Sequence, residues 1–150
     1  MRPTDFVRPV WSKLSLPLAS ASVRAGFPSP ADDHLEKRLD LNEHLIQHPA
    51  ATFFVFADGG SMTGAGIRTG DLLVVDRSLE ASDGDVVVAV LDGEFTVKRL
   101  RIRKGRPFLC PEAEGYQTIE IGEDARFEIW GVVSNVVHSF RGPHGADRSR

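Results

Sequence analysis

The sequence predicts a mainly β fold, a twisted β-sandwich or partly closed barrel, and three observations support it. Short apolar segments alternate with Gly, Asp and Pro turns from residue 52 onward. Fourteen glycines, nine prolines and only two methionines favour a turn-rich fold over a helical bundle. A chain of 150 residues with 41% hydrophobic content is most simply one domain with a core.

The first 24 residues differ in composition from the rest and predict an extended arm. They are basic, rich in proline and small residues, and have no sustained periodicity. Charges and prolines interrupt any signal-peptide core, and no stretch has the roughly 20 apolar residues of a membrane span. The arm is basic and the remainder acidic, which leaves specific docking and a solvated basic tail as alternatives.

Two short helices are expected after the arm. In the first, from residue 31, Asp32 is the cap and Leu35 and Leu39 share one face. The second begins with a capping box at residues 40–43, continues to residue 47 and ends before a proline.

His44 and His48 have the spacing of metal ligands on this second helix. No acidic third ligand at a recognised spacing accompanies them, so solvent-facing histidines are favoured over zinc. Cys110 is the one cysteine, so no internal disulfide is possible, and a reducing cytoplasm fits. We therefore expect no metal, no cofactor and a cytoplasmic protein.

The remaining chain is expected to be strands and turns. The predicted strands are residues 52–56, 71–75, 85–91, 94–103, 106–109, 118–121 and 127–138. Asp92-Gly93 is a hairpin turn signal between two of them. Five apolar residues near the end belong either to the core or to a dimer surface: Val132, Val133, Val136, Val137 and Phe140.

One basic cluster raises nucleic-acid binding as an alternative: Arg99, Arg101, Arg103, Lys104 and Arg106. Acidic residues surround this cluster in the sequence and no aromatic residues interleave it, which favours a solvated sheet face or a partner contact. The net charge of -3 also argues against a general nucleic-acid binder.

Ser61 and Lys98 are the residues whose surroundings indicate chemistry. Ser61 lies in a glycine-rich turn, residues 58–62, which would present its hydroxyl at the end of a strand. Lys98 alternates with Thr96 and Leu100 on one face of a predicted strand. A desolvated lysine loses its proton more easily and can then activate a serine. The alternative is a turn serine and a lysine whose amine reaches solvent.

Five blocks follow one another around this pair, at residues 59–62, 66–67, 70–76, 84–89 and 95–100. Their order and spacing resemble the self-cleaving Ser/Lys peptidase domain shared by LexA-type repressors and UmuD. The similarity covers residues 25–141, and the upstream blocks at 27–33 and 40–42 resemble UmuD in particular. Gly60 replaces the aspartate usual in UmuD relatives, at a position where a backbone amide is the group needed.

The resemblance implies roles for individual residues. Ser61 would be the nucleophile and Lys98 its general base, and the backbone amides of Gly60 and Ser61 would form the oxyanion hole. The bond that is cut would be Ala25–Gly26, because these relatives cut a Cys-Gly or Ala-Gly bond upstream of the serine. Small side chains make that bond accessible, although other small dipeptides occur in the chain.

The resemblance also implies a cellular role. Residues 1–25 would be a removable arm, residues 26–141 the peptidase and dimerisation domain, and residues 142–150 a flexible tail. The protein would be a homodimeric accessory subunit of an error-prone translesion DNA polymerase in the DNA-damage (SOS) response. A RecA-type nucleoprotein filament would stimulate self-cleavage, and the shortened form would join a UmuC-type polymerase subunit.

Rival functions remain open. A LexA-type regulator would need a helix-turn-helix domain, and the residues before Ala25 are too few and too irregular to form one, so sequence-specific DNA binding is not expected. A signal-peptidase-type enzyme would require a membrane anchor. A non-catalytic interaction module would share the β fold but keep its arm.

Overall fold

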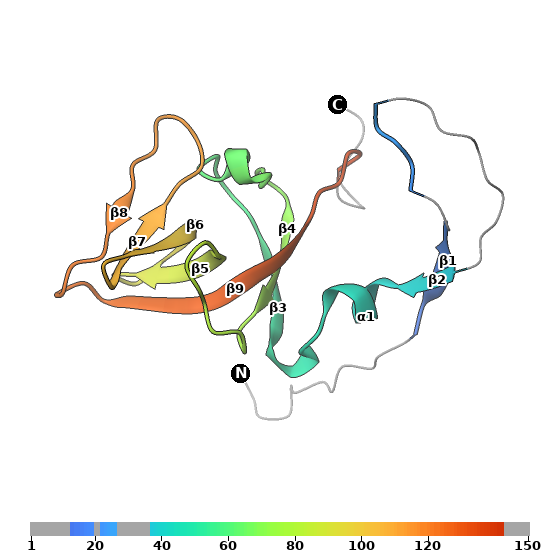
Figure 1. The fold of residues 1–150 in the computed structure, drawn as a ribbon, viewed down its shortest axis with the longest axis horizontal. Coiled ribbons are helices and arrows are strands. Elements are labelled where there is room, and N and C mark those ends of the chain that lie inside the picture. The colour runs from blue at the N-terminus through green and yellow to red at the C-terminus, as the bar shows by residue number, and fades with distance from the viewer. Residues whose placement is uncertain (1–12, 20–21, 27–36, 143–150) are drawn as a thin grey trace. The chain divides into compact units, whose positions relative to one another are not determined.

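A computed structural model describes residues 13–19, 22–26 and 37–142 of the chain (Figure 1). These residues belong to two compact units, one ending at Gln47 and the other beginning at His48. The predicted boundaries of the arm, the domain and the tail are set by the expected cleavage site and not by these compact units, so they stay predictions. Residues 143–150 of the expected tail lie outside the described residues.

The first unit contains a two-stranded antiparallel pair. Strand β1 (Ser15–Leu18) pairs with β2 (Lys37–Asp40) in a register that places Leu16 opposite Leu39. The Arg38 guanidinium donates to the Ser15 carbonyl oxygen at 2.6 Å. The first predicted helix is therefore wrong where the structure describes it, at residues 37–39; residues 31–36 lie outside the described part. Pairing across a long sequence separation outweighs the helical spacing of two leucines here.

A short helix, α1 (Leu41–Leu45), follows β2. The Asp40 carboxylate caps it by accepting the Asn42 amide at 2.9 Å, which confirms the predicted start. The helix ends earlier than predicted, since the Ile46 amide closes the last turn on the Asn42 carbonyl oxygen. None of the helices in the described part of the chain has the length and apolar character needed to cross a membrane.

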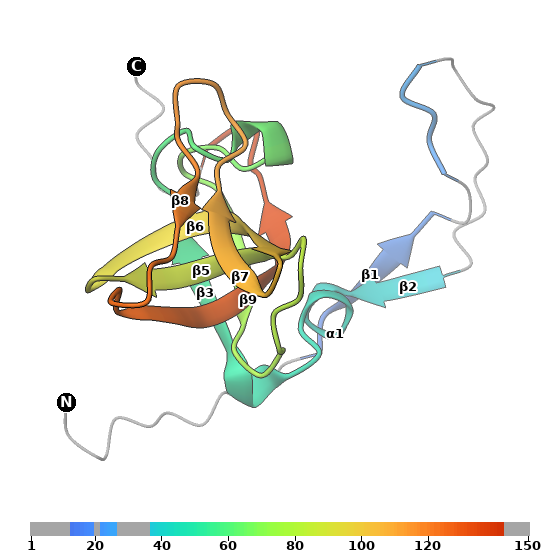
Figure 2. The same cartoon turned by 60° about the vertical axis from the view of Figure 1, so that its left-hand side comes forward.

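The second unit is built on a seven-stranded antiparallel sheet, in the order β3-β4-β9-β5-β6-β7-β8 (Figure 2). It follows a short 3₁₀ turn, η2 (Pro49–Ala51). The strands are β3 (Thr52–Phe56), β4 (Leu72–Asp76), β5 (Val86–Leu91), β6 (Glu94–Arg103), β7 (Arg106–Cys110), β8 (Ile119–Glu120) and β9 (Phe127–Val137). Each lies close to its predicted position, so the mainly β class is confirmed. The described strands of this unit form one twisted sheet with β3 and β8 at its edges, not a closed barrel.

Strand β9 joins the two halves of this sheet. Its first part pairs with β5 and its last part with β4, and both ladders contain a register shift. Gly131 lies where the partner changes, and a Cβ there would be 2.5 Å from a Val75 methyl carbon. A glycine at position 131 therefore permits the close approach of β9 to β4.

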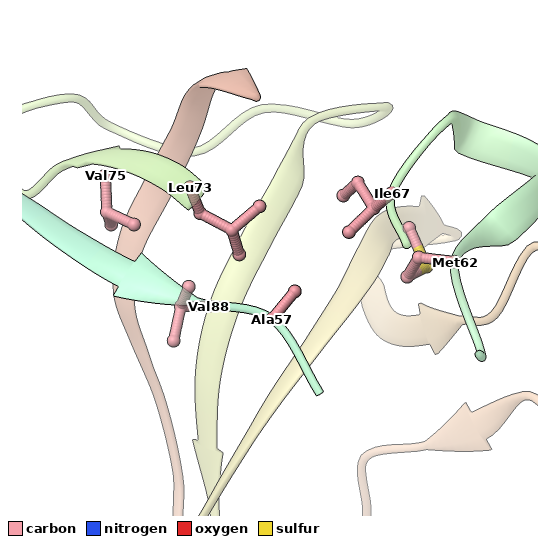
Figure 3. Close-up of a cluster of buried hydrophobic side chains, with 6 residues drawn as sticks. All are labelled: Ala57, Met62, Ile67, Leu73, Val75 and Val88. Atoms are coloured by element: carbon pink, nitrogen blue, oxygen red, sulfur yellow. The ribbon is translucent and has the colours of Figure 1, made fainter. Parts of the chain in front are cut away.

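Two buried clusters pack on the sheet. One combines Leu73, Val75 and Val88 with Ala57, Met62 and Ile67 of the loop after β3 (Figure 3). The other is formed by Val87, Ala89, Leu100, Leu109 and Val132. Adjacent residues of β5 thus face different clusters, as strand alternation requires.

The apolar residues of β9 divide between core and surface. Val132 is buried and Val133 packs against the first cluster, so these two are core residues. Val136, Val137 and Phe140 are exposed, and the Phe140 side chain is 95% accessible.

Much of the predicted basic cluster is paired with acidic side chains. Arg99 pairs with Glu112, Arg103 with Asp83 and Arg106 with Glu120. The charges that would meet a phosphate backbone are therefore partly neutralised within the sheet.

Candidate active site

Ser61 lies in a loop between β3 and β4 whose base is closed by backbone hydrogen bonds. The Ala57 amide donates to the Asp71 carbonyl oxygen at 2.9 Å, and the Gly70 amide donates to the Ala57 oxygen at 2.8 Å. Further in, the Thr69 hydroxyl accepts the Gly59 amide at 3.0 Å and donates to the Gly59 carbonyl oxygen at 3.2 Å. These bonds hold the base of the loop that carries Ser61 in one conformation.

Two buried side chains anchor the same loop to the core. Met62 and Ile67 are each 3% exposed and pack with Leu73 and Ala57, as Figure 3 shows. Between them a 3₁₀ turn, η3 (Thr63–Ala65), ends at Gly66 in the left-handed region, φ 87°. Because Met62 is fixed in the core, the backbone of its neighbour Ser61 is fixed as well.

The segment after β7 supports the loop from its other side. The Glu112 amide donates to the Ser61 carbonyl oxygen at 2.7 Å, and the Gly64 amide donates to the Glu112 carbonyl oxygen at 2.6 Å. These two bonds join the Ser61 turn to residues more than forty positions later in the chain.

Lys98 is brought to the site by the hairpin of β5 and β6. Asp92 and Gly93 have φ of 48° and 83° at its turn, which confirms the predicted Asp-Gly hairpin. The Lys98 amine lies 3.0 Å from Ser61 Oγ, 2.7 Å from Thr96 Oγ1 and 3.1 Å from the Val97 carbonyl oxygen. The structure therefore brings Ser61 and Lys98 into direct contact.

These contacts suit a neutral amine that acts as a base. An uncharged lysine has two N–H donors and one lone pair. If the Thr96 hydroxyl and the Val97 carbonyl oxygen accept the two N–H groups, the lone pair is left for the Ser61 hydroxyl proton. Burial lowers the pKa of Lys98 from its ordinary value of 10.5, because removal from water disfavours the ammonium form.

A cavity of about 460 Å³ opens beside the Ser61–Lys98 contact. Its wall is largely apolar and includes Val55, Phe56, Val88, Phe95 and Trp130. The Phe95 and Trp130 rings meet edge to face with centroids 5.8 Å apart. An apolar hollow with a few polar groups at one end is typical of a site that binds a largely apolar segment.

The backbone amides of Gly60 and Ser61 are the donors predicted for the oxyanion hole. Among the residues that the structure describes, neither amide donates a hydrogen bond to another group of the chain. A side chain at position 60 would place its Cβ 3.4 Å from the Tyr116 hydroxyl, an ordinary contact. Steric crowding therefore does not require a glycine at position 60.

The remaining predicted residues lie elsewhere in the chain. Ala25 and Gly26 belong to the first unit, and both are exposed. His44 and His48 are exposed, and the His48 ring contacts the Asp76 carboxylate at 2.6 Å. Over the described ranges, no group of three or more His, Cys, Asp or Glu is arranged to hold a metal ion.

Two residues of the site had no assigned role in the sequence interpretation. Thr96 was placed on the same face as Lys98 by strand alternation, and this was the available signal for its contact with the amine. Glu112 had no such signal, because its approach to the Ser61 turn depends on the path of the chain after β7.

Comparison with known families agrees with this arrangement. The profile of the peptidase S24-like family matches residues 17–134, which include both Ser61 and Lys98. The chain belongs to the peptidase S24-like family. This membership confirms the resemblance to a peptidase domain that the five sequence blocks indicate.

Named relatives of this S24-like chain extend the comparison. Protein ImpA of Salmonella typhimurium is 49% identical over 125 residues, which are 83% of this chain and 85% of ImpA. Protein MucA of Escherichia coli is 46% identical over 122 residues, 81% of this chain and 83% of MucA. The LexA repressor of Paracidovorax citrulli is 37% identical over 140 residues, 92% of this chain and 62% of the repressor. The predicted LexA/UmuD kinship is thereby confirmed.

Proposed function

We propose that this S24-like protein is a self-cleaving serine peptidase that cuts its own Ala25–Gly26 bond. The observation that carries the proposal is the 3.0 Å contact between the Lys98 amine and the Ser61 hydroxyl. The lowered pKa of Lys98 supports it, because a base must be uncharged to accept a proton.

The first half of the reaction forms an acyl-enzyme. Neutral Lys98 takes the Ser61 hydroxyl proton as Ser61 Oγ attacks the Ala25 carbonyl carbon. The resulting oxyanion is held by the backbone amides of Gly60 and Ser61. Collapse breaks the Ala25–Gly26 bond, and the Lys98 ammonium gives its proton to the leaving amine of Gly26.

The second half releases the arm. Lys98, again neutral, accepts a proton from water, and the hydroxide attacks the ester between Ser61 and Ala25. The ester bond to Ser61 Oγ breaks, and Lys98 returns the proton to the serine. The products are residues 1–25 with a free carboxylate and residues 26–150 with a new amino terminus.

The proposed cellular role is self-processing in the cytoplasm during the SOS response. A RecA-type filament stimulates the cut, and the homodimer of the shortened form becomes the accessory subunit of a UmuC-type translesion polymerase. The resemblance of residues 27–33 and 40–42 to UmuD supports this role. The higher identity to ImpA and MucA, 49% and 46% against 37% for the LexA repressor, also favours it over repression.

The test is the intact mass of purified protein after incubation at mildly alkaline pH. We expect a single cut after Ala25 in the wild type and in Ser82→Ala, a matched change of an exposed serine. Ser61→Ala and Lys98→Ala should stay intact and folded. A wild type that never shortens would support the non-catalytic interaction module instead, and a Lys98→Ala chain that shortens itself would overturn the dyad.

Filament stimulation is a separate measurement. Addition of RecA-type filament on single-stranded DNA should raise the first-order rate of the wild-type cut and leave Ser61→Ala uncut. An unchanged wild-type rate would remove the filament from the proposal while leaving the peptidase in place.

A further inference from the structure

Glu112 makes contacts through both its backbone and its side chain. Its backbone amide and carbonyl oxygen bond to Ser61 and Gly64, at 2.7 and 2.6 Å. Its carboxylate accepts a hydrogen bond from the Arg99 guanidinium, which also donates to the Gly84 carbonyl oxygen at 2.7 Å. One residue thus joins the loop that carries Ser61 to strand β6.

Arg99 is the neighbour of Lys98 on that strand. Its own backbone position is fixed on both sides, since it lies opposite Val86 in β5 and opposite Cys110 in β7. A displacement of Glu112 relative to Arg99 would therefore move the Ser61 turn relative to the strand that carries Lys98.

We propose that the Arg99–Glu112 ion pair sets the separation of Ser61 and Lys98, so that both of its members are positioning residues for self-cleavage. Neither side chain contacts the reacting atoms; each acts through the segment that it holds. This inference rests on the proposed function and adds two residues to it.

The required precision explains why such a support matters. Proton transfer needs a hydrogen-bond distance between base and hydroxyl, and a misplacement of about 1 Å can cost on the order of 100-fold in rate. The two reacting residues lie in different elements and touch only through their side-chain tips. The Arg99–Glu112 pair connects the Ser61 loop to β6 at the residue next to Lys98, and it therefore restricts the distance between the Lys98 amine and the Ser61 hydroxyl.

The pair is also more buried than the other arginine–carboxylate pairs of the described residues. The Arg99 and Glu112 side chains are 23% and 29% exposed, whereas Arg103 and Asp83 are 60% and 46% exposed. A charged hydrogen bond that is shielded from water constrains geometry more strongly than a solvated one. Arg103 therefore offers a matched control on the same strand.

The experiment compares Arg99→Met, Glu112→Ala and the control Arg103→Met in the full-length chain. The first readout is the first-order rate of self-cleavage across alkaline pH. The second is the rate at which a fluorophosphonate probe labels Ser61, which requires an activated serine but no bound arm. The third is the midpoint of thermal unfolding.

We expect Arg99→Met and Glu112→Ala to lower both the cleavage plateau and the labelling rate by about 10-fold or more, since the serine is less well aligned. The control should keep both rates. The double variant should lose no more than either single variant, because the two residues form one link.

Three results would overturn the inference: unchanged rates in both variants, additive losses in the double variant, or losses no larger than the control at equal unfolding midpoints. If one variant fails to fold, the other still gives the comparison. A wild type that does not cleave defeats the proposed function itself, whereas a cleaving wild type with equally active variants defeats the positioning role alone.

Discussion

A side chain at position 64 would place its Cβ 2.5 Å from the carbonyl oxygen of Glu112, the same oxygen that accepts the Gly64 amide. The loop that carries Ser61 and the segment after β7 can approach this closely only because residue 64 is glycine. The contact is backbone to backbone, so neither partner can turn aside as a flexible side chain would.

Gly64→Ala should therefore shift the Ser61 turn. We predict slower self-cleavage and a loss of stability of about 1–3 kcal/mol, typical of overpacking. Gly122→Ala is the matched control, because nothing lies within 4 Å of a Cβ at that exposed glycine. Denaturant unfolding and cleavage rates check both; a Gly64→Ala chain as stable and active as Gly122→Ala would contradict the close contact.

Thr96→Val should weaken the orientation of the Lys98 amine. The valine keeps the shape but removes the oxygen that lies 2.7 Å from the amine, so the lone pair is aimed less well at Ser61. We predict a plateau cleavage rate lower by about 10-fold, a part of the roughly 100- to 10,000-fold that general-base catalysis contributes. Thr118→Val, at an exposed position, serves as control. Equal rates in the two variants would show that Thr96 has no part in orienting the amine.

Lys98 should make folding stability depend on pH. Its pKa is lowered in the folded protein by burial, so between this value and about 10.4 the unfolded chain binds more protons than the folded one. Stability from this group therefore rises with pH across that window. We compare the unfolding midpoint of Lys98→Met with that of the wild type. We predict that the variant's advantage is largest at neutral pH and becomes smaller as the pH rises. A difference in midpoint that stays constant with pH would show that burial of the Lys98 ammonium does not destabilise the folded protein.

Asp71 should act in the opposite direction, at acid pH. Burial alone would raise its pKa, but hydrogen bonds from the Arg68 amide at 2.8 Å and the His138 ring at 2.5 Å outweigh burial, and the pKa is lowered below 3.8. The stability it gives is present above the unfolded pKa of about 3.9 and is lost as the pH falls through the lowered folded pKa.

Asp71→Asn should therefore destabilise the neutral-pH protein by about 1–3 kcal/mol, because it weakens a buried hydrogen-bonded group. The gap to wild type should shrink as the pH falls below about 4. Urea unfolding at several pH values measures both effects, with the exposed Asp124→Asn as control. A gap that is independent of pH would contradict the role given to the carboxylate charge.

Strand positions in the second unit could be predicted from the sequence because the pattern there is local. Period-two alternation and turn residues such as Asp92-Gly93 fix where each strand begins and ends. The pairing of Ser61 with Lys98 required the family resemblance, since nothing local indicates that positions 37 residues apart touch.

Features that depend on distant pairing were missed. Strand β2 places Leu39 opposite Leu16, and the intervening sequence gives no sign of that partner, so the helical spacing of Leu35 and Leu39 predicts a helix instead. Glu112 was missed for the same reason: its importance comes from the two backbone bonds it makes across the fold. A single sequence shows the hydrophobic periodicity of a segment, but it does not show which distant segment pairs with it in the fold.

The most direct test of the Ser61–Lys98 dyad is the rate of Ala25–Gly26 cleavage from about pH 5 to about pH 11, a range that extends well below and just above the ordinary lysine pKa of about 10.4. We predict a first-order rate that rises through the pKa of Lys98 and then levels off, and no cleavage at any pH in Lys98→Ala. A wild-type rate that is flat across mildly alkaline pH, or a cut in Lys98→Ala, would contradict the base assigned to this reaction.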